Sequence, residues 1–342
     1  MALQASGPIS LADIAEEFGD SPPHSMSEFY RDGGKVPGVN TNVPTSGLIR
    51  LGNFFSAVNE LLQQVTAQAS VNAQTIFGSD WGAAVPKRLL IPSGVTIGPL
   101  TIPSGLGGTL TVQNEGEIQG LGGSANSGAG GHAITASSSF TLTNTGAVRG
   151  GGGGGGVGGT GGQGSYSYAN YTSFYYSENP FWMWTEGVQG ATYWNGTQIA
   201  YTLSAGQSPY YTGGYYYERG SFVREINWGD GDREYRYQIR RYNYLTAYSS
   251  GGTGGTGGSG QGYGQSLLGG SGGAGGGTNA GAGGTGGSGG NWGQAGATGG
   301  TGANGNYTGG SAGAAGGAAG RAVLMNAGTL TLNNSGTING AY

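Results

Sequence analysis

The sequence predicts a mainly β and irregular fold: a small helix-containing N-terminal domain, short β-solenoid rungs, a bundle of polyglycine II helices and an inserted aromatic-rich β domain. Three observations lead there: a Gly-Gly-x rhythm, a strand-and-turn repeat present in three copies, and a tyrosine-rich block between two glycine tracts. The expected parts are residues 1–85 (N-terminal domain), 86–150 (rungs and first glycine run), 151–164 with 251–329 (glycine bundle), 165–250 (insert) and 330–342 (closing rung).

The first 60 residues contain a weak internal repeat, SGPISLADI at 6–14 and SGLIRLGNF at 46–54. Ser10 followed by Asp13 has the spacing of a capping box, and the apolar residues after it form a one-sided stripe that ends at Gly19. We therefore expect two short helices in this domain. The apolar spacing between Asn53 and Ile76 predicts one further amphipathic helix, too short for a coiled coil.

The strand-and-turn repeat reads LTVQNEGEIQG at 110–120, FTLTNTGAVRG at 140–150 and LTLNNSGTING at 330–340. The copies share Thr at the second position, Asn at the fifth, and Gly at the seventh and eleventh. Alternating apolar residues followed by Asn-x-Gly predict a strand and a turn, stacked as in a β-solenoid. Glycine runs follow the first two copies and the long tract leads back to the third, so the rungs form the base of the bundle.

Glycine at two of every three positions, as in GGTGGTGGSG at 251–260, suits a polyglycine II helix with three residues per turn and two bare backbone faces. Collagen is excluded because all 11 prolines lie at or before Pro209. A flexible linker would also be glycine-rich, but these runs are long, recurrent and bracketed by strand repeats. Twelve such residues span about 37 Å, so the runs suit a spacer.

The block 165–248 holds 24 aromatic residues, including 17 of the 21 tyrosines, with hairpin signals at Asn195-Gly196 and around Gly229–Asp232. Adjacent side chains on a strand point to opposite faces, so its tyrosine pairs and triplet cannot all be buried. We expect a ligand-binding surface, with an ordinary aromatic core as the alternative. Its candidate residues are Tyr175, Tyr176, Trp182, Trp184, Trp194, Tyr210, Tyr211, Tyr215, Tyr216 and Tyr217.

Composition excludes several classes of protein. A charged fraction of 9% and a net charge of −4 argue against a nucleic-acid partner. The absence of cysteine excludes disulfides and thiolate metal sites. The N-terminus lacks the basic and apolar regions of a signal peptide, and no stretch approaches the ~20 apolar residues of a membrane span. We expect neither Sec export nor membrane insertion, so an extracellular role requires lysis or carriage on a larger particle.

No pattern in the chain indicates catalysis or a cofactor. The two histidines, His24 and His132, lie in loop-type sequence without a nucleophile pattern, and the glycine run 150–156 lacks the Gly-Lys-Ser/Thr ending of a phosphate loop. Asp230, Asp232 and Glu234 could offer carboxylates to Ca²⁺, although neighbouring arginines favour ion pairing; cation binding by Asp230 and Asp232 is left open. We expect no catalytic residue, metal or cofactor.

The elements SGPISLADI, EFG, SMSEFYRDGG and VPTSG resemble the amino-terminal segment of many tailed-phage tail-fibre and minor tail proteins. IPSGVTIG, LTVQNEGEIQG and the polyglycine resemble glycine-rich phage receptor-binding proteins, and the bundle is similar to the polyglycine II sandwich of T-even phage tail-fibre adhesins. The resemblance implies that glycine helices form a scaffold whose distal joining segments contact the host. Contact positions would then include the insert and the breaks at Tyr263, Trp292 and Tyr307. One departure is that a single 84-residue insert replaces several short loops.

We therefore expect a non-enzymatic virion adhesin of the distal tail, made in the host cytoplasm. Its N-terminal domain would dock to other tail or baseplate proteins, and its insert would bind a host glycan or outer-membrane protein. Whether it acts as a monomer or a homotrimer stays open. The alternatives are a purely structural tail protein, a glycan depolymerase, which would need paired acids in a walled cleft, and an ice-binding protein, which would need a flat Thr/Ala face.

Overall fold

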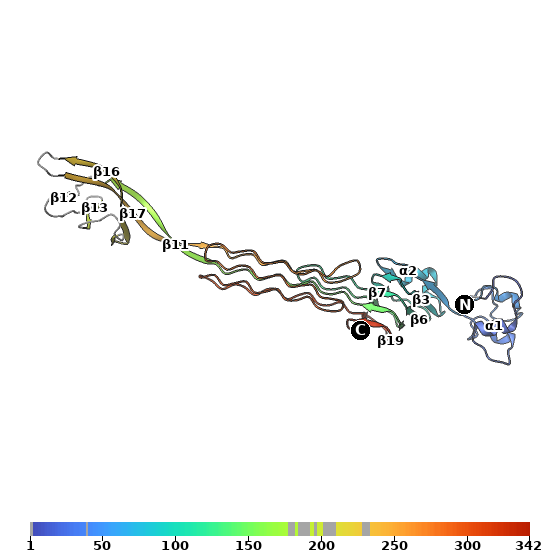
Figure 1. Ribbon diagram of the computed structural model, residues 1–342. Coiled ribbons are helices and arrows are strands. Elements are labelled where there is room, and N and C mark those ends of the chain that lie inside the picture. The colour runs from blue at the N-terminus through green and yellow to red at the C-terminus, as the bar shows by residue number, and fades with distance from the viewer. Residues whose placement is uncertain are drawn as a thin grey trace. The chain divides into compact units, whose positions relative to one another are not determined.

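The computed structural model describes residues 3–38, 40–176, 182–183, 192–194, 197–200, 210–227 and 233–342. Within 164–249, it describes the side chains of residues 164–171, 211–218, 225 and 240–249. The chain divides into two compact units, Met1–Gln163 with Ser250–Tyr342, and Gly164–Ser249 (Figure 1). The first unit contains the N-terminal domain, a β-solenoid and the glycine runs, and the second contains the aromatic insert.

The N-terminal domain begins with helix α1, Leu11–Glu17, and the capping box expected at its start is confirmed. The Ser10 amide donates to Asp13 Oδ2 at 2.7 Å, and the Asp13 amide donates to Ser10 Oγ at 3.2 Å. The second copy of the repeat forms a 3₁₀-helix, η2 (Leu51–Phe54), in place of the expected second helix, and η1 (Met26–Phe29) precedes it. Rings of Phe18, Phe29 and Phe54 meet at centroid distances of 6.2–6.3 Å in the small core.

The amphipathic helix predicted between Asn53 and Ile76 is wrong. The segment forms strands β1 (Leu61–Gln64) and β2 (Val71–Asn72), followed by a short helix α2 (Ala73–Phe77) and the 3₁₀-helix η3 (Gly78–Gly82). β1 pairs in parallel with the first full rung, so it satisfies backbone groups that a helix would leave unpaired at that edge. Val65 and Val71 are buried in the solenoid core, and this burial replaces the stripe that a helix would have formed.

The solenoid has three parallel sheets, with strand orders β1-β3-β6-β9-β19, β20-β10-β7-β4 and β18-β8-β5-β2. Successive turns of the chain add one strand to each sheet, and alternate side chains point into a shared apolar core. The remaining strands are β3 (Lys87–Ile91), β4 (Thr96–Ile97), β5 (Leu100–Ile102), β6 (Leu110–Asn114), β7 (Glu117–Gln119), β8 (Ile134–Ala136), β9 (Phe140–Asn144), β10 (Ala147–Arg149), β18 (Val323–Met325), β19 (Leu330–Asn334) and β20 (Thr337–Asn339).

The shared letters of the repeat have structural reasons. The three copies stack in register, and the fifth-position asparagines form a ladder in which Asn114 Nδ2 donates to Asn144 Oδ1 and Asn144 Nδ2 donates to Asn334 Oδ1, each at 2.7 Å. The seventh-position glycines lie against the rung before them. A Cβ added at Gly146 would lie 2.0 Å from the Gly116 carbonyl oxygen, so no side chain fits there.

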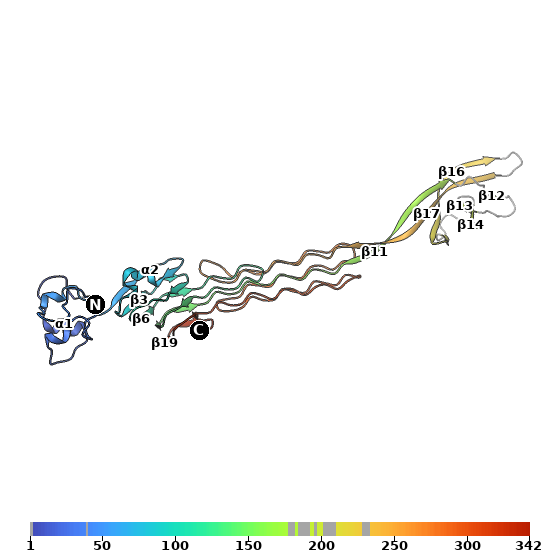
Figure 2. The same ribbon diagram turned by 180° about the vertical axis from the view of Figure 1, so that it is seen from behind.

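Two glycine excursions leave the solenoid at the same corner. The hairpin 120–131 lies between β7 and β8, and the long excursion lies between β10 and β18. Its extended runs 150–163, 250–262, 266–277, 280–291, 294–305 and 308–320 lie side by side (Figure 2). Together with the hairpin they form the glycine bundle. Gly152, Gly155, Gly158 and Gly161 donate to carbonyl oxygens of Gln261, Gly258, Gly255 and Gly252 at 2.8–2.9 Å. This three-residue period is that of a polyglycine II helix, whose assignment stays a prediction.

Run 150–163 is the centre of the bundle. It exchanges backbone hydrogen bonds with the hairpin 120–131, donates to runs 250–262 and 294–305, and accepts from runs 280–291 and 308–320. Cβ atoms added at Gly151 and Gly154 would lie 1.8 Å from the carbonyl oxygens of Leu121 and Ser124 in the hairpin. Beyond the hairpin turn this third face is open, and the sequence places Val157, Thr160 and Gln163 there. The unbroken glycines at 150–156 therefore mark the length over which the hairpin covers the run.

Candidate functional site

The insert is built on an antiparallel sheet with the strand order β11-β17-β16-β15, in which β12 also pairs with β17. A separate hairpin pairs β13 with β14. The predicted turns at Asn195-Gly196 and Gly229–Asp232 lie outside the described residues, but the strands on either side of each turn do pair. The bounds are β11 Gly164–Tyr176, β12 Trp182–Met183, β13 Thr192–Trp194, β14 Thr197–Ala200, β15 Tyr210–Thr212, β16 Tyr215–Asn227 and β17 Arg233–Ser249.

Four tyrosines on four neighbouring strands form a continuous row across one face of this sheet. Strand register pairs Tyr171 with Tyr242, Tyr242 with Tyr216, and Tyr216 with Tyr211. Their successive ring centroids lie 5.1, 5.4 and 4.8 Å apart. Aromatic pairs at these distances stabilise each other beyond the area they bury. We call Tyr171, Tyr242, Tyr216 and Tyr211 the tyrosine row.

Polar groups border the row. The Tyr171 hydroxyl donates to Glu218 Oε1 at 3.4 Å, and Arg240 Nη1 lies 3.8 Å from the same oxygen. Burial raises the pKa of Tyr242 to about 12, and the neighbouring Tyr244 contributes to this rise. Burial also raises the pKa of Tyr171. Both phenols are protonated at neutral pH, and the Tyr171 hydroxyl is the donor in its bond to Glu218.

Both interpretations of the aromatic block apply, each to different residues. Tyr217 and Tyr242 are only 5% and 4% exposed and belong to local core, whereas Tyr211 and Tyr244 are 59% and 53% exposed. Tyr244 lies on β17 beside the middle of the row, with its ring perpendicular to that of Tyr242 at 5.6 Å and 5.2 Å from that of Tyr216. The face thus has a buried centre and exposed aromatic margins.

Several exposed tyrosines of the insert are not among the predicted contact residues, because adjacent pairs were the signal for exposure. Tyr166, Tyr168, Tyr171 and Tyr248 are 39%, 44%, 46% and 57% exposed. They lie where β11 pairs with β17, in the segments GSYSYANY (164–171) and YNYLTAYS (242–249). The available signal was the alternation of tyrosine with small polar residues, which places every second residue on the same face of a strand.

The structure places most of the other predicted contact residues on strands of the insert. Tyr175 and Tyr176 pair with Ile239 and Gln238, Trp182 with Glu234, Trp194 with Thr197, and Tyr210 with Tyr217. Tyr215 lies under the guanidinium of Arg241, 4.3 Å from the ring centroid. Trp184 lies outside the described residues.

The two candidates in the glycine bundle lie at opposite ends of its runs. The amide of Tyr307 donates to the Gln163 carbonyl at 3.2 Å, at the end of the bundle where the chain leaves for the insert, and its side chain is exposed. Trp292 lies in a turn at the rung end, since Gly293 donates to the Gly150 carbonyl at 2.8 Å. Its ring is 5.9 Å from the Arg149 guanidinium, which is ion-paired with Glu117. Tyr263 also lies at the rung end, where its backbone amide donates to the Gly120 carbonyl at 2.9 Å.

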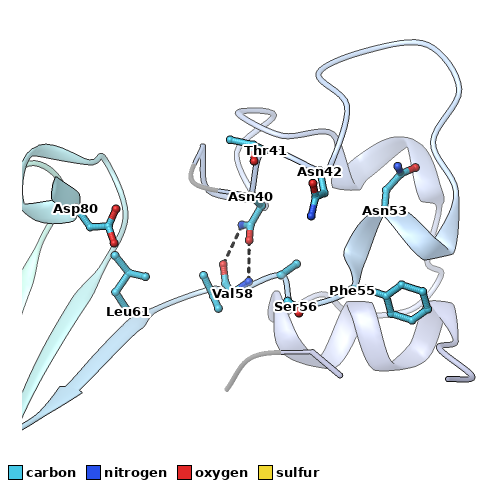
Figure 3. Close-up of a pocket in the computed structure, with 10 residues that line it drawn as sticks. Asn40, Thr41, Asn42, Asn53, Phe55, Ser56, Val58, Leu61 and Asp80 are labelled. Atoms are coloured by element: carbon cyan, nitrogen blue, oxygen red, sulfur yellow. Dashed lines mark hydrogen bonds between the residues drawn. The ribbon is translucent and has the colours of Figure 1, made fainter. Parts of the chain in front are cut away.

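A pocket of about 230 Å³ lies where the N-terminal domain leads into β1 (Figure 3). Asn40 shapes it: its Oδ1 accepts from the Val58 amide at 2.8 Å, and its Nδ2 donates to the Val58 carbonyl at 2.9 Å. The side chain therefore pairs with the backbone as a neighbouring strand would. Asn40 in the pocket lining thus fixes the segment that connects the domain to β1. We assign no ligand to the pocket.

Both histidines have structural partners. His24 Nδ1 lies 2.9 Å from Asp20 Oδ2, and His132 Nδ1 accepts the Arg321 amide proton at 2.9 Å. Within the described residues, no group of three or more His, Cys, Asp or Glu side chains could hold a metal ion, while Asp230 and Asp232 lie outside those residues. None of the helices described is long and apolar enough to cross a membrane.

The comparisons with known proteins bear on the solenoid and most of the insert. The family model described as phage tail fibre adhesin Gp38 matches residues 60–235, from the first solenoid strand into β17. The chain belongs to the phage tail fibre adhesin Gp38 family. This adhesin is a component of the phage tail that binds a receptor on the host cell, and the resemblance to tail-fibre adhesins seen in its sequence is confirmed.

One solved structure is similar over nearly the full length. It is the crystal structure of the gp37–gp38 adhesin tip complex of the bacteriophage S16 long tail fiber, with 16% sequence identity and a TM-score of 0.37. The match covers 99% of this chain and 100% of that chain. No curated protein sequence matches the adhesin.

Proposed function

We propose that the insert, residues 164–249, carries the principal receptor-contact surface of this adhesin and that the tyrosine row is its centre. The observation that supports this most directly is the continuity of four rings on four adjacent strands, with exposed margins at Tyr211 and Tyr244. Tyrosine offers a large, rigid contact area with a polar tip at low entropy cost. The receptor is a host glycan or an outer-membrane protein.

Of the two bundle residues, Tyr307 fits a secondary contact and Trp292 fits a structural role. Tyr307 lies at the same end of the bundle as the insert's attachment points, Gln163 and Ser250. Trp292 packs over Arg149, which itself pairs with Glu117, so its ring fastens a turn of the bundle to the solenoid.

The N-terminal domain, expected to span residues 1–85, is proposed to attach the adhesin to another tail protein. Its own core lies within residues 14–57, because Val65, Val71 and Trp81 pack in the solenoid core instead. Three short helical segments there begin in the same manner: α1, η1 and η2 each bury a large side chain four residues after the cap, at Ile14, Phe29 and Phe54. The residue after each cap, Leu11, Met26 or Leu51, is only partly buried or exposed, and Leu48 is 71% exposed. Repeated apolar positions on a small surface suit docking.

The proposed role is non-enzymatic. The interactions described for His24 and His132 are structural, and the features of the insert described above are those of a contact surface. A depolymerase would shorten its receptor, so incubation of the purified adhesin with host-surface polysaccharide should leave the chain-length distribution unchanged. Shortening would overturn this part of the proposal.

The decisive test is to remove the insert without disturbing the bundle. Runs 150–163 and 250–262 are antiparallel neighbours, joined by the Gly161 to Gly252 hydrogen bond of 2.8 Å. Gln163 can therefore be linked to Ser250 by an Asn-Gly turn. We expect this variant to fold and to lose binding to intact host cells, whereas Tyr307→Ala weakens binding less. Undiminished binding by the deletion variant would refute the proposal and indicate that the bundle turns contact the receptor.

A further inference from the structure

In the part of the insert that the structure describes, one stretch of sheet has two strands. Residues 164–170 of β11 pair with 243–249 of β17, and β16 reaches β17 only as far as the Tyr216–Tyr242 pair. We call residues 164–170 and 243–249 the two-stranded ribbon. A sheet normally packs at least one face on other structure, because a lone pair of strands is marginally stable in water.

Both faces of this ribbon expose tyrosines. The register pairs Tyr244 with Ala169 and Tyr248 with Ser165, which places these two tyrosines on one face. It pairs Tyr166 with Ala247 and Tyr168 with Leu245, which places that pair on the opposite face. All four tyrosines and Leu245 are exposed. Among the described residues, the ring of Tyr244 joins the ribbon to the rest of the sheet through its contacts with Tyr216 and Tyr242. A core formed by those residues does not account for the exposed tyrosines.

The ribbon also lacks the protections that exposed strands usually have. Its segments GSYSYAN and NYLTAYS contain no charged residue and no proline, whereas natural edge strands carry such residues against unwanted pairing. Uncharged strands with exposed aromatic side chains indicate a surface that a partner covers when the adhesin binds. The partner's complementary surface is expected to be uncharged as well.

We propose that the two-stranded ribbon inserts into an uncharged cleft of a host-surface protein, which contacts both faces of the ribbon. This inference rests on the proposed receptor-binding role of the insert and names the class of receptor. A flat surface or a single polysaccharide chain would cover one face and leave two tyrosines in water. A symmetric contact with a second copy of the adhesin would likewise pair one face with itself. Protruding tyrosine-rich, serine-rich elements insert into concave protein epitopes in the same manner.

The test compares the two faces in the full-length adhesin. One double variant carries Tyr244→Thr and Tyr248→Thr, and the other carries Tyr166→Thr and Tyr168→Thr. Threonine keeps strand propensity while removing the ring. The matched controls are Tyr→Phe at the same four positions and Tyr342→Thr, which removes an exposed ring outside the insert. Binding is measured as apparent Kd on intact host cells and on cells shaved with protease.

We expect each face variant to weaken binding at least tenfold, and protease shaving of the cells to abolish wild-type binding. Loss from one face only would indicate a flat contact, and loss from neither would remove the ribbon from the interface; either result overturns the inference. Wild-type binding that survives protease but not periodate would point to a glycan and overturn it too. So would a wild-type oligomer that the face variants dissociate.

Folding of the variants is checked by thermal unfolding. If a double variant unfolds, the single changes Tyr248→Ser and Tyr166→Ser, one on each face, replace it in the same comparison. The insert deletion separates this inference from the proposed function. Binding lost on deletion but retained by both face variants refutes only the cleft, whereas binding retained on deletion refutes the receptor role of the insert.

Discussion

Replacing Gly154 by alanine should destabilise the glycine bundle, whereas the same change at Gly272 should not. An added Cβ at Gly154 would lie 1.8 Å from the Ser124 carbonyl oxygen, against an ordinary contact of 3.4 Å or more. The hairpin 120–131 must then move away by at least 3.4 − 1.8 = 1.6 Å. At Gly272 nothing lies within 4 Å of the added atom, so that position is the matched control.

The magnitude follows from the hydrogen bonds that such a movement would break. The hairpin and run 150–155 are joined by four backbone bonds of 2.7–2.9 Å, in which the donors are Gly123, Ser127, Gly151 and Gly154. At about 1 kcal/mol each, losing two to four of them costs roughly 2–4 kcal/mol. Alanine recovers about 0.4–1 kcal/mol by restricting the unfolded chain. The net loss at Gly154 is therefore roughly 1–3 kcal/mol, while Gly272→Ala should gain about 0.4–1 kcal/mol.

Differential scanning calorimetry at one fixed scan rate measures this difference. For a unit of this size each kcal/mol shifts Tm by roughly 2–4 °C, so Gly154→Ala should lower Tm by roughly 2–12 °C. Gly272→Ala should leave Tm unchanged or raise it by a few degrees. Equal Tm values for the two variants would refute the argument that close approach of neighbouring backbones, and not composition alone, requires glycine at 150–156.

Three further predictions concern polar groups of the first unit, of which Asn144 and Lys87 are buried and His132 is partly buried. Asn144→Leu removes the middle of the asparagine ladder, where Asn144 is fully buried, and should lower the free energy of unfolding in urea by roughly 2–4 kcal/mol; Thr143→Ala is the control, and an equal effect would contradict the ladder. Lys87→Met removes the ammonium that donates to the carbonyl oxygens of Ala83, Val85 and Gly107 at 2.7–3.1 Å, and should cost about 1–3 kcal/mol in the same assay, whereas Arg88→Met should cost less. Burial, and then Arg321, lowers the pKa of His132 below its ordinary 6.5, so the folded state binds fewer protons and stability should fall as pH drops below about 6.5. His132→Gln should flatten this part of the Tm-versus-pH curve, and an unchanged slope would show that another group is responsible.

Local rules written in the sequence predicted much of the first unit. The Ser10 capping box, the stacked repeat with Asn at its fifth position, and the three-residue period of the glycine runs each depend on neighbours in the chain or on a repeated unit. The segment after Asn53 failed for a related reason. Its apolar spacing fits a helix, but the edges of β3 and β5, formed by residues more than 20 positions later, offered parallel pairing to β1 and β2 and burial for Val65 and Val71.

The candidate site likewise has features that the sequence determined and features that only the tertiary structure decided. Sequence alone determined that an aromatic β insert interrupts the glycine tract, that strand alternation exposes some of its tyrosines, and that the chain resembles tail-fibre adhesins. Only the tertiary structure decided that Tyr242 is buried between Tyr171 and Tyr216 while Tyr244 is exposed, and that Trp292 and Tyr307 lie at opposite ends of the bundle runs. Only it showed that run 150–163 is central. Periodicity specifies which way a side chain points along its own strand or run, but burial depends on which distant segments pack against it, and that is a property of the folded chain.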